Sequence, residues 1–221
     1  MSKDNTLSNG LRIFLVSLFV SSVVTANLIA SKIVQFGWFI FPAGTIAYCI
    51  TFLCTDIYTE FFGKKEASYV VLGGFIANLL MVLLVLTSVL MPIAHFQLEY
   101  QKIYSQVLSM APRITFASMV AYITAQTHDI YAFHFWGRVT RGRYLWVRNN
   151  ASTIVSQGID TIIFSLIAFL YLIPFNSLLI MMLTLWLVKL LIALLDTPFC
   201  YLGCVIIRKK LGLQTIWEKK M

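Results

Sequence analysis

Six long apolar segments alternate with short polar stretches along the chain, and this alternation is the strongest signal in the sequence. A helix needs about 20 apolar residues to cross the hydrocarbon core of a bilayer, and each segment is near or above that length. The pattern therefore predicts an all-α, polytopic membrane protein, with residues 1–221 forming a single domain of six transmembrane helices. The predicted spans cover residues 11–34, 42–62, 67–91, 112–133, 151–173 and 178–207.

Composition excludes the main alternatives to a membrane protein. Hydrophobic residues make up 59% of the 221 residues and charged residues only 12%, whereas a soluble domain carries roughly 25% charged residues. A soluble chain of this size exposes too much surface for so few polar side chains. An ordinary soluble enzyme and a disordered chain are therefore excluded. The four cysteines lie inside apolar segments with no histidine near them in sequence, which favours buried free thiols over a zinc site.

The net charge of +8 follows from where the basic residues lie. Cytoplasmic loops of membrane proteins are enriched in Lys and Arg. Most basic residues fall in the two tails and in the second and fourth loops, and only Lys32 and Lys102 fall on the opposite side. Both the N and the C terminus are therefore predicted to be cytoplasmic. No nucleic-acid-binding motif accompanies the charge, so we expect no nucleic-acid partner. The basic residues on the predicted cytoplasmic side are Lys3, Arg12, Lys64, Lys65, Arg138, Arg141, Arg143, Arg148, Arg208, Lys209, Lys210, Lys219 and Lys220.

Ionisable residues inside the predicted spans indicate function. Each costs about 2.5–3.5 kcal/mol at the centre of a membrane helix on insertion scales, so such groups face the bundle interior or an aqueous cavity. Carboxylates outnumber cations among them, which predicts that some are protonated or neutralised by a donor from the substrate. The set is Asp56, Glu60, Arg113, Asp129, Asp160, Lys189 and Asp196.

Helical spacing gathers most of these residues onto shared faces. Hydroxyl side chains on such faces usually bond to carbonyls of their own helix. Faces that also carry Asp and Gln favour a cavity, and with both termini inside, the acids and amides lie in the inner half of the bundle. The shared faces carry Asp56 and Glu60 in the second span, Gln126 and Asp129 in the fourth, Gln157 and Asp160 in the fifth, and Lys189 and Asp196 in the sixth.

The side chains of this cavity suit a flat heterocycle that is rich in hydrogen-bond donors. A carboxylate accepts two parallel hydrogen bonds from an amidine-like edge, an amide both donates and accepts, and an aromatic face stacks on a ring. An amine or a metal cation fits the same residues, although no histidine lies on the polar faces to favour a metal. No cofactor is indicated. The aromatic residues nearest the polar faces are Tyr48, Phe52, Tyr122, Phe164 and Trp186.

Several motifs resemble those of the queuosine precursor transporter family, also called the VUT family, over nearly the whole chain. The order and spacing of the motifs make the resemblance specific, and Asp196 is the one acid that the family pattern does not include. The matching residues are Thr55 to Gly63 followed by Ala67; Ala117, Ser118, Ala121, Tyr122, Gln126 and Asp129; Leu145 to Arg148; Ser152, Thr153, Ser156, Gln157, Asp160, Thr161 and Phe164; Lys189, Thr197, Pro198 and Tyr201; and Asn27 in the first span.

The resemblance implies a six-helix carrier of the bacterial inner membrane, without its own ATPase, that takes up 7-deazaguanine compounds such as preQ0, preQ1 or queuine for tRNA queuosine modification. Asp56, Asp160 or both then accept the ring donors or bind an amine. Lys189 either approaches the ring carbonyl or neutralises a carboxylate when the site is empty, and the amides read the remaining edge. The candidate substrate-binding residues are Asn27, Asp56, Glu60, Gln126, Asp129, Gln157, Asp160 and Lys189.

Two other classes of function stay open at this point. The first is a substrate-capture subunit of a vitamin or nucleobase transporter, which needs a separate energising partner. The second is an intramembrane enzyme with paired aspartates, but the chain has neither a GxGD sequence nor an HExxH zinc motif, so no enzyme activity is expected. Six helices make a small bundle for alternating access, which makes a homodimer plausible. The expected partners are therefore the small-molecule substrate, the lipid bilayer and a second copy of the chain.

Overall fold

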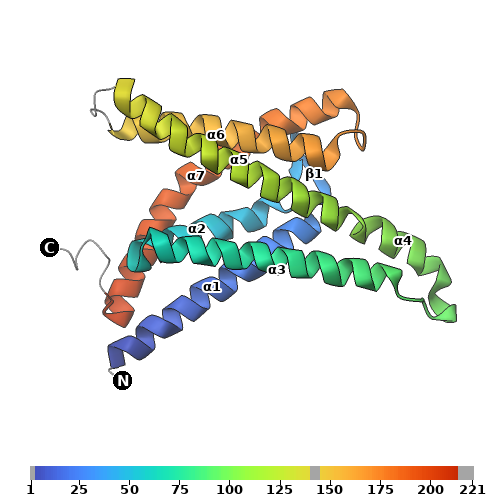
Figure 1. The fold of residues 1–221 in the computed structure, drawn as a ribbon, viewed down its shortest axis with the longest axis horizontal. Helices are drawn as coiled ribbons and strands as arrows, with labels where there is room; N and C mark the ends of the chain where they lie inside the picture. The colour runs from blue at the N-terminus through green and yellow to red at the C-terminus, as the bar shows by residue number, and fades with distance from the viewer. Residues whose placement is uncertain (1–2, 140–144, 214–221) are drawn as a thin grey trace. The chain divides into compact units, whose positions relative to one another are not determined.

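The computed structural model describes residues 3–139 and 145–213, and these residues are almost entirely helical. Six of the helices correspond one to one with the six predicted apolar segments (Figure 1). The elements are α1 (Lys3–Ile29), β1 (Ile33–Phe36), β2 (Phe39–Pro42), α2 (Thr45–Phe62), α3 (Lys64–Leu90), η1 (His95–Gln97), α4 (Leu98–Leu108), α5 (Met110–Val139), α6 (Leu145–Phe169) and α7 (Phe175–Leu211).

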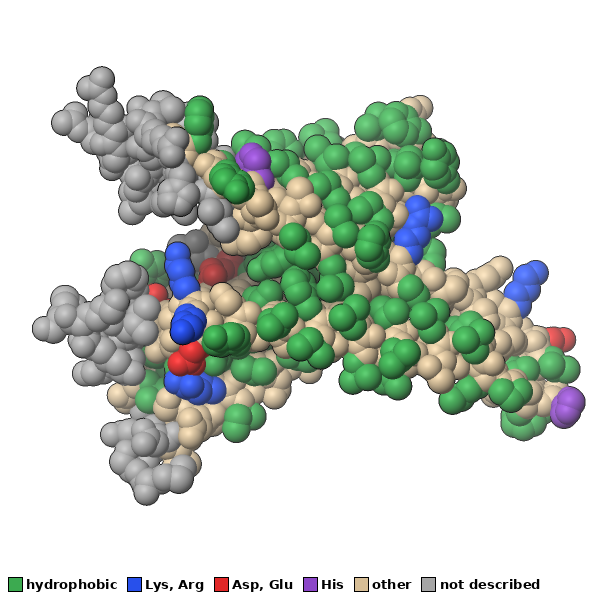
Figure 2. Space-filling model, viewed as in Figure 1, with side chains coloured by type: hydrophobic (Ala, Val, Ile, Leu, Met, Phe, Trp, Pro, Cys, Tyr) green, Lys and Arg blue, Asp and Glu red, His purple; other side chains and the backbone are tan. Residues whose placement is uncertain are grey.

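Length and hydropathy confirm an all-α, polytopic membrane protein. Four helical stretches in the described part of the chain are long and apolar enough to cross a membrane, and the apolar stretch Thr153–Phe169 is shorter. Large hydrophobic side chains cover much of the molecular surface (Figure 2). On α3, for example, Leu72, Ile76 and Leu83 are 53%, 60% and 61% exposed. Such a surface is suited to lipid rather than to water.

A two-stranded antiparallel hairpin follows α1, where the sequence predicted helix up to residue 34. Helix α1 ends at Ile29, and Ile33 to Phe36 pair with Phe39 to Pro42. The β-branched Ile33 and Val34 favour a strand. Gly37, at the first central position of a two-residue loop, adopts the positive φ of 61° that such hairpins need. The predicted span of residues 11–34 is therefore wrong at its C-terminal end.

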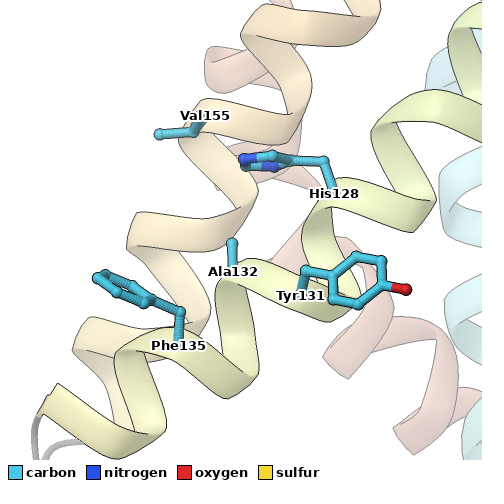
Figure 3. A pocket seen from close by; sticks show the side chains of 5 residues that line it. All are labelled: His128, Tyr131, Ala132, Phe135 and Val155. Atoms are coloured by element: carbon cyan, nitrogen blue, oxygen red, sulfur yellow. The ribbon is translucent and has the colours of Figure 1, made fainter.

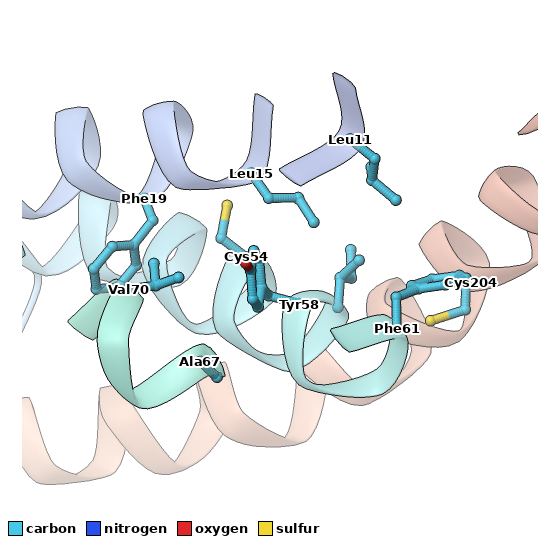
Figure 4. Packing of buried hydrophobic residues seen from close by; sticks show 10 residues of the cluster. Leu11, Leu15, Phe19, Cys54, Tyr58, Phe61, Ala67, Val70 and Cys204 are labelled. Carbon is cyan, nitrogen blue, oxygen red and sulfur yellow. The ribbon is translucent and has the colours of Figure 1, made fainter. Parts of the chain in front are cut away.

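The described residues form two compact units. The first unit comprises residues 1–30, 43–84 and 191–221, and the second comprises residues 31–42 and 85–190. The core of the first unit joins helices α1, α2, α3 and α7 (Figure 4). Its buried members are Leu11, Leu15, Phe19, Cys54, Ile57, Tyr58, Phe61, Ala67, Val70 and Cys204.

The second unit is built on the pair α5 and α6, which pack against each other along their lengths. On α5, Ala117, Ala121 and Ala125 recur every fourth residue and are at most 8% exposed. On α6, Thr161 and Ser165 are 1% and 0% exposed. Small residues at a membrane helix interface allow the backbones to approach closely, so this pair gives the polar residues of α6 a rigid support.

The predicted cytoplasmic termini remain a prediction. Arg141, Arg143, Lys219 and Lys220 lie outside the described residues. The side chains of Lys3, Arg138 and Arg148 are also outside the described part of the structure.

Candidate functional site

An ion pair in the second unit joins α6 and α7, which carry the predicted site residues Asp160 and Lys189. The Lys189 ammonium of α7 donates to the Asp160 carboxylate of α6. The two side chains are 13% and 21% exposed, respectively. A buried cation and a buried anion each need a partner. The structure therefore brings together two of the predicted residues, and their roles toward a substrate stay a prediction.

Two further contacts fix α7 close to this ion pair. The Trp186 indole N–H donates to the Ile154 carbonyl of α6 at 3.1 Å. The backbone N–H of Ile40, in the hairpin, donates to the Thr184 hydroxyl at 3.2 Å. Trp186 was predicted as a stacking residue, and here its N–H holds α7 against α6.

Gln157 and Gln126, two predicted site residues of the second unit, differ in exposure. Gln157 is half-buried on α6, one turn before Asp160, whereas Gln126 on α5 is exposed together with Tyr122, which is 38% exposed. The packing of α5 against α6 therefore does not bury Gln126 or Tyr122. The side chain of Asp129 lies outside the described residues.

His128 is a polar residue of α5 that sequence reasoning passed over. Its Nδ1 lies 3.1 Å from the hydroxyl oxygen of Ser156 on α6, and Ser156 is 5% exposed. Which of the two atoms donates depends on the imidazole tautomer. His128 directly precedes Asp129 in the sequence. Its position beside the predicted polar face of α5 could therefore have indicated that it belongs with the polar residues.

A cavity of about 350 Å³ opens beside His128 (Figure 3). Helix α5 contributes His128, Tyr131, Ala132 and Phe135, and α6 contributes Val155. The lining is apolar except for the imidazole nitrogens of His128 and the hydroxyl group of Tyr131. The volume is at the lower end of the roughly 300–1,000 Å³ of small-molecule sites.

In the first unit, a buried hydrogen-bond network joins α1, α2 and α3. Asn27 donates through Nδ2 to Oδ1 of Asn78 at 2.7 Å and accepts from the Tyr48 hydroxyl at 3.3 Å. Asn78 donates to the carbonyl of Gly74 at 2.9 Å. Both asparagines are at most 2% exposed. Asn27 therefore joins helices in this structure, and its predicted role in reading the substrate stays a prediction.

Asn78 is a second residue that sequence reasoning missed. It is the one amide in the α3 sequence and lies in its apolar central part, and an isolated amide in a membrane helix usually pairs with another helix.

Asp56 of α2 and Asp196 of α7 both belong to the first unit. Asp196 is 9% exposed, whereas Asp56 is exposed. The expectation that some carboxyl groups in the spans are protonated stays a prediction. Glu60, one turn after Asp56, is half-buried.

Arg113 of α5 bonds to the backbone at the end of α6. Its Nε and Nη2 donate to the carbonyls of Ile167 and Leu170, each at 2.7 Å. These carbonyls lie at the C-terminal end of α6, where the last turn leaves carbonyl groups unpaired. Arg113 therefore caps α6.

Several threonine hydroxyls in the spans bond to their own helices, as the simpler alternative predicted. The hydroxyls of Thr51, Thr55, Thr59, Thr124 and Thr161 donate to carbonyls of their own helices. All four cysteines are free thiols. Within the described residues no cluster of three or more His, Cys, Asp or Glu side chains could hold a metal ion.

The eight predicted site residues fall into two groups. Asn27, Asp56 and Glu60 belong to the first unit. The second unit holds the other five, namely Gln126, Asp129, Gln157, Asp160 and Lys189.

Comparison with known proteins assigns the chain to a family. Residues 42–203 match the family described as "Putative vitamin uptake transporter". The "Probable queuosine precursor transporter" of Bacillus subtilis (strain 168) is 32% identical over 181 residues, which are 81% of this chain and 79% of that relative. The "Queuosine precursor transporter" of Escherichia coli (strain K12) is 28% identical over 165 residues, which are 71% of this chain and 68% of that relative.

No solved structure matches the chain. The family match covers most of the residues, including both Asp56 and Asp160–Lys189, and both relatives are bacterial transporters. The chain is therefore a multi-pass bacterial membrane protein that belongs to the vitamin uptake transporter family, and it is a transporter rather than an enzyme.

Proposed function

We propose that this transporter takes up a 7-deazaguanine precursor of queuosine, namely queuine, preQ1 or preQ0, for tRNA modification. The names of the two relatives support a queuosine precursor as the substrate. The observation that carries the proposal is the Asp160–Lys189 ion pair, because its chemistry matches one edge of the 7-deazaguanine ring.

A guanine-like edge presents one acceptor, the ring carbonyl, beside two N–H donors. A carboxylate accepts two parallel hydrogen bonds, and an ammonium donates to a carbonyl. In our proposal Asp160 accepts from the two ring donors while Lys189 donates to the carbonyl. Gln157, one turn along α6 from Asp160, completes the polar contacts to the ring.

The charge of the pair also suits this class of ligand. Asp160 and Lys189 neutralise one another, so a neutral ring binds between them without leaving a buried charge uncompensated. The amine of queuine or preQ1 then requires a second carboxyl group. Asp129 of the second unit is the proposed candidate for it, with Gln126 as a further polar contact, and the roles of Asn27, Asp56 and Glu60 of the first unit stay predictions.

The test is uptake of labelled queuine, preQ1 and preQ0 into bacterial cells that lack their own queuosine precursor transporter and express only this chain. The proposal expects saturable uptake of at least one of the three compounds and restored queuosine in tRNA. Absence of uptake by cells in which the chain is present in the membrane contradicts a self-sufficient carrier. Uptake that appears only after a partner protein is added indicates a substrate-capture subunit instead.

A further inference from the structure

Two side chains of α7 reach across to α6, and only one of them is charged. Lys189 meets Asp160, and three residues earlier Trp186 donates its indole N–H to the Ile154 carbonyl at 3.1 Å. At 100° per residue, two side chains three positions apart lie on the same side of a helix, about 60° from one another. The bond at Trp186 therefore fixes the rotation of α7 that turns Lys189 toward α6.

The surface of α6 leaves room for the indole. A Cβ atom at Gly158 would lie 3.6 Å from the indole nitrogen, which is ordinary van der Waals distance. A methyl group at this position is thus accommodated, whereas a larger side chain would displace the ring. Gly158 lies between Ile154 and Asp160 on the same helix, so the indole packs beside the carboxylate-bearing turn.

A third contact holds α7 in place at Thr184, two residues before Trp186. The Thr184 hydroxyl is fully buried and lies against the backbone of Ile40 in the hairpin. Leu178, Met181 and Leu185 continue the buried face of α7, each at most 1% exposed. Lys189 extends this face by one turn, so its charged end depends on α7 keeping its orientation.

We infer that Trp186 is a positioning residue for transport: its hydrogen bond to the Ile154 carbonyl holds Lys189 in register with Asp160. The inference rests on the proposed function, because it assumes that the Asp160–Lys189 pair binds substrate. Trp186 itself is not required to touch the substrate.

The test compares Trp186→Phe with Trp38→Phe by measuring the KM and the Vmax of labelled queuine uptake, with Vmax divided by the amount of protein in the membrane. Trp186→Phe keeps an aromatic ring and removes the N–H. Trp38, in the hairpin, is 64% exposed and serves as the control. The loss of one neutral hydrogen bond is expected to raise KM by about 3- to 10-fold for Trp186→Phe, with Vmax per transporter unchanged. A purely structural role would lower the amount of protein and leave KM as it is.

A second pair of variants approaches the same contact from α6. Gly158→Leu should displace the indole and raise KM, whereas Gly158→Ala should leave KM unchanged because its methyl group fits. Wild-type KM values for both Trp186→Phe and Gly158→Leu would overturn the inference. If those values are normal while Asp160→Asn raises KM, the proposed function stands and only the role of Trp186 is lost. Normal uptake by Asp160→Asn would instead remove the site on which both proposals depend.

Discussion

At the scale of single residues, the account depends most on the Asp160 carboxylate. Its side chain is 21% exposed and paired with Lys189, so it has a partner before substrate arrives. Sequence reasoning selected both residues, because ionisable groups inside membrane spans are costly and are kept for a function. It could not select their pairing, which depends on how α7 crosses α6.

Asp160→Asn should weaken substrate binding while the protein still inserts into the membrane. An amide accepts only one of the two ring donors and no longer attracts Lys189, and the loss of one charge-assisted contact costs about 1.5–3 kcal/mol. The expected result is a rise in the KM for queuine of about 10- to 150-fold, measured by initial rates of uptake.

The matched control is Glu99→Gln, the same change of acid to amide on the exposed surface of α4. It should leave KM unchanged. If Asp160→Asn transports normally at limiting substrate, Asp160 is not part of the site. If the protein instead disappears from the membrane, the ion pair is structural.

Some residue-scale features were beyond the reach of the sequence. The bond between the Asn27 amide and Asn78, 51 positions away, is one of them. No local spacing relates two residues so far apart in the chain. His128 was overlooked because the polar face of α5 was drawn through Gln126 and Asp129, and Ser156 lies on another helix.

At the scale of elements, the six helices followed directly from the apolar segments, whereas their ends did not. Hydropathy does not separate an apolar strand from an apolar helix, so Ile33 and Val34 were read as the end of α1. The turn at Gly37 was the local signal that a hairpin follows. Sequence also placed Arg113 at the start of its span without showing that it bonds to the last turn of α6.

Removing the Arg113 cap should destabilise the pair α5 and α6. Two carbonyls at the end of α6 lose a charged donor in Arg113→Met, and hydrogen bonds to charged groups are worth about 1.5–3 kcal/mol each. Arg113→Lys has a single ammonium and should restore only part of the stability. Thermal unfolding of the detergent-solubilised protein measures the effect, and we expect the order wild type, Lys, Met.

Lys102→Met is the control for this series, because Lys102 is exposed on α4. Its Tm should equal that of the wild type. Equal Tm values for Arg113→Met and Lys102→Met would show that the bonds to Ile167 and Leu170 do not stabilise the fold.

At the scale of the whole molecule, charge distribution predicts the orientation in the membrane. Basic residues concentrate in the two tails and in the second and fourth loops, and loops rich in Lys and Arg are retained in the cytoplasm. In a variant whose four cysteines are replaced by serine, a cysteine introduced at Arg141 should not react with a membrane-impermeant thiol reagent added to intact cells.

A cysteine introduced at Lys102 provides the opposite control and should react from outside. Labelling of both positions after the cells are opened confirms that both cysteines are accessible. Reaction of the Arg141→Cys variant in intact cells would reverse the predicted orientation.

Family membership and fold class could be predicted from the sequence because both depend on local motifs and hydropathy. The two compact units could not, since α3 and α7 each contribute to both of them. Substrate identity depends on groups brought together from different helices. It is therefore tested by competition between ligands rather than read from sequence motifs.

The most direct test of the central claim is competition for labelled queuine uptake by unlabelled preQ1, guanine and adenine. Adenine has no N1–H and no 2-amino group, so it leaves the proposed partners of the ring edge unpaired at about 1–3 kcal/mol each. It should therefore compete at least ~100-fold worse than preQ1, while guanine, which keeps the edge, should compete better than adenine. If adenine competes as well as preQ1, the transporter does not read a guanine-like edge and the proposed substrate is wrong.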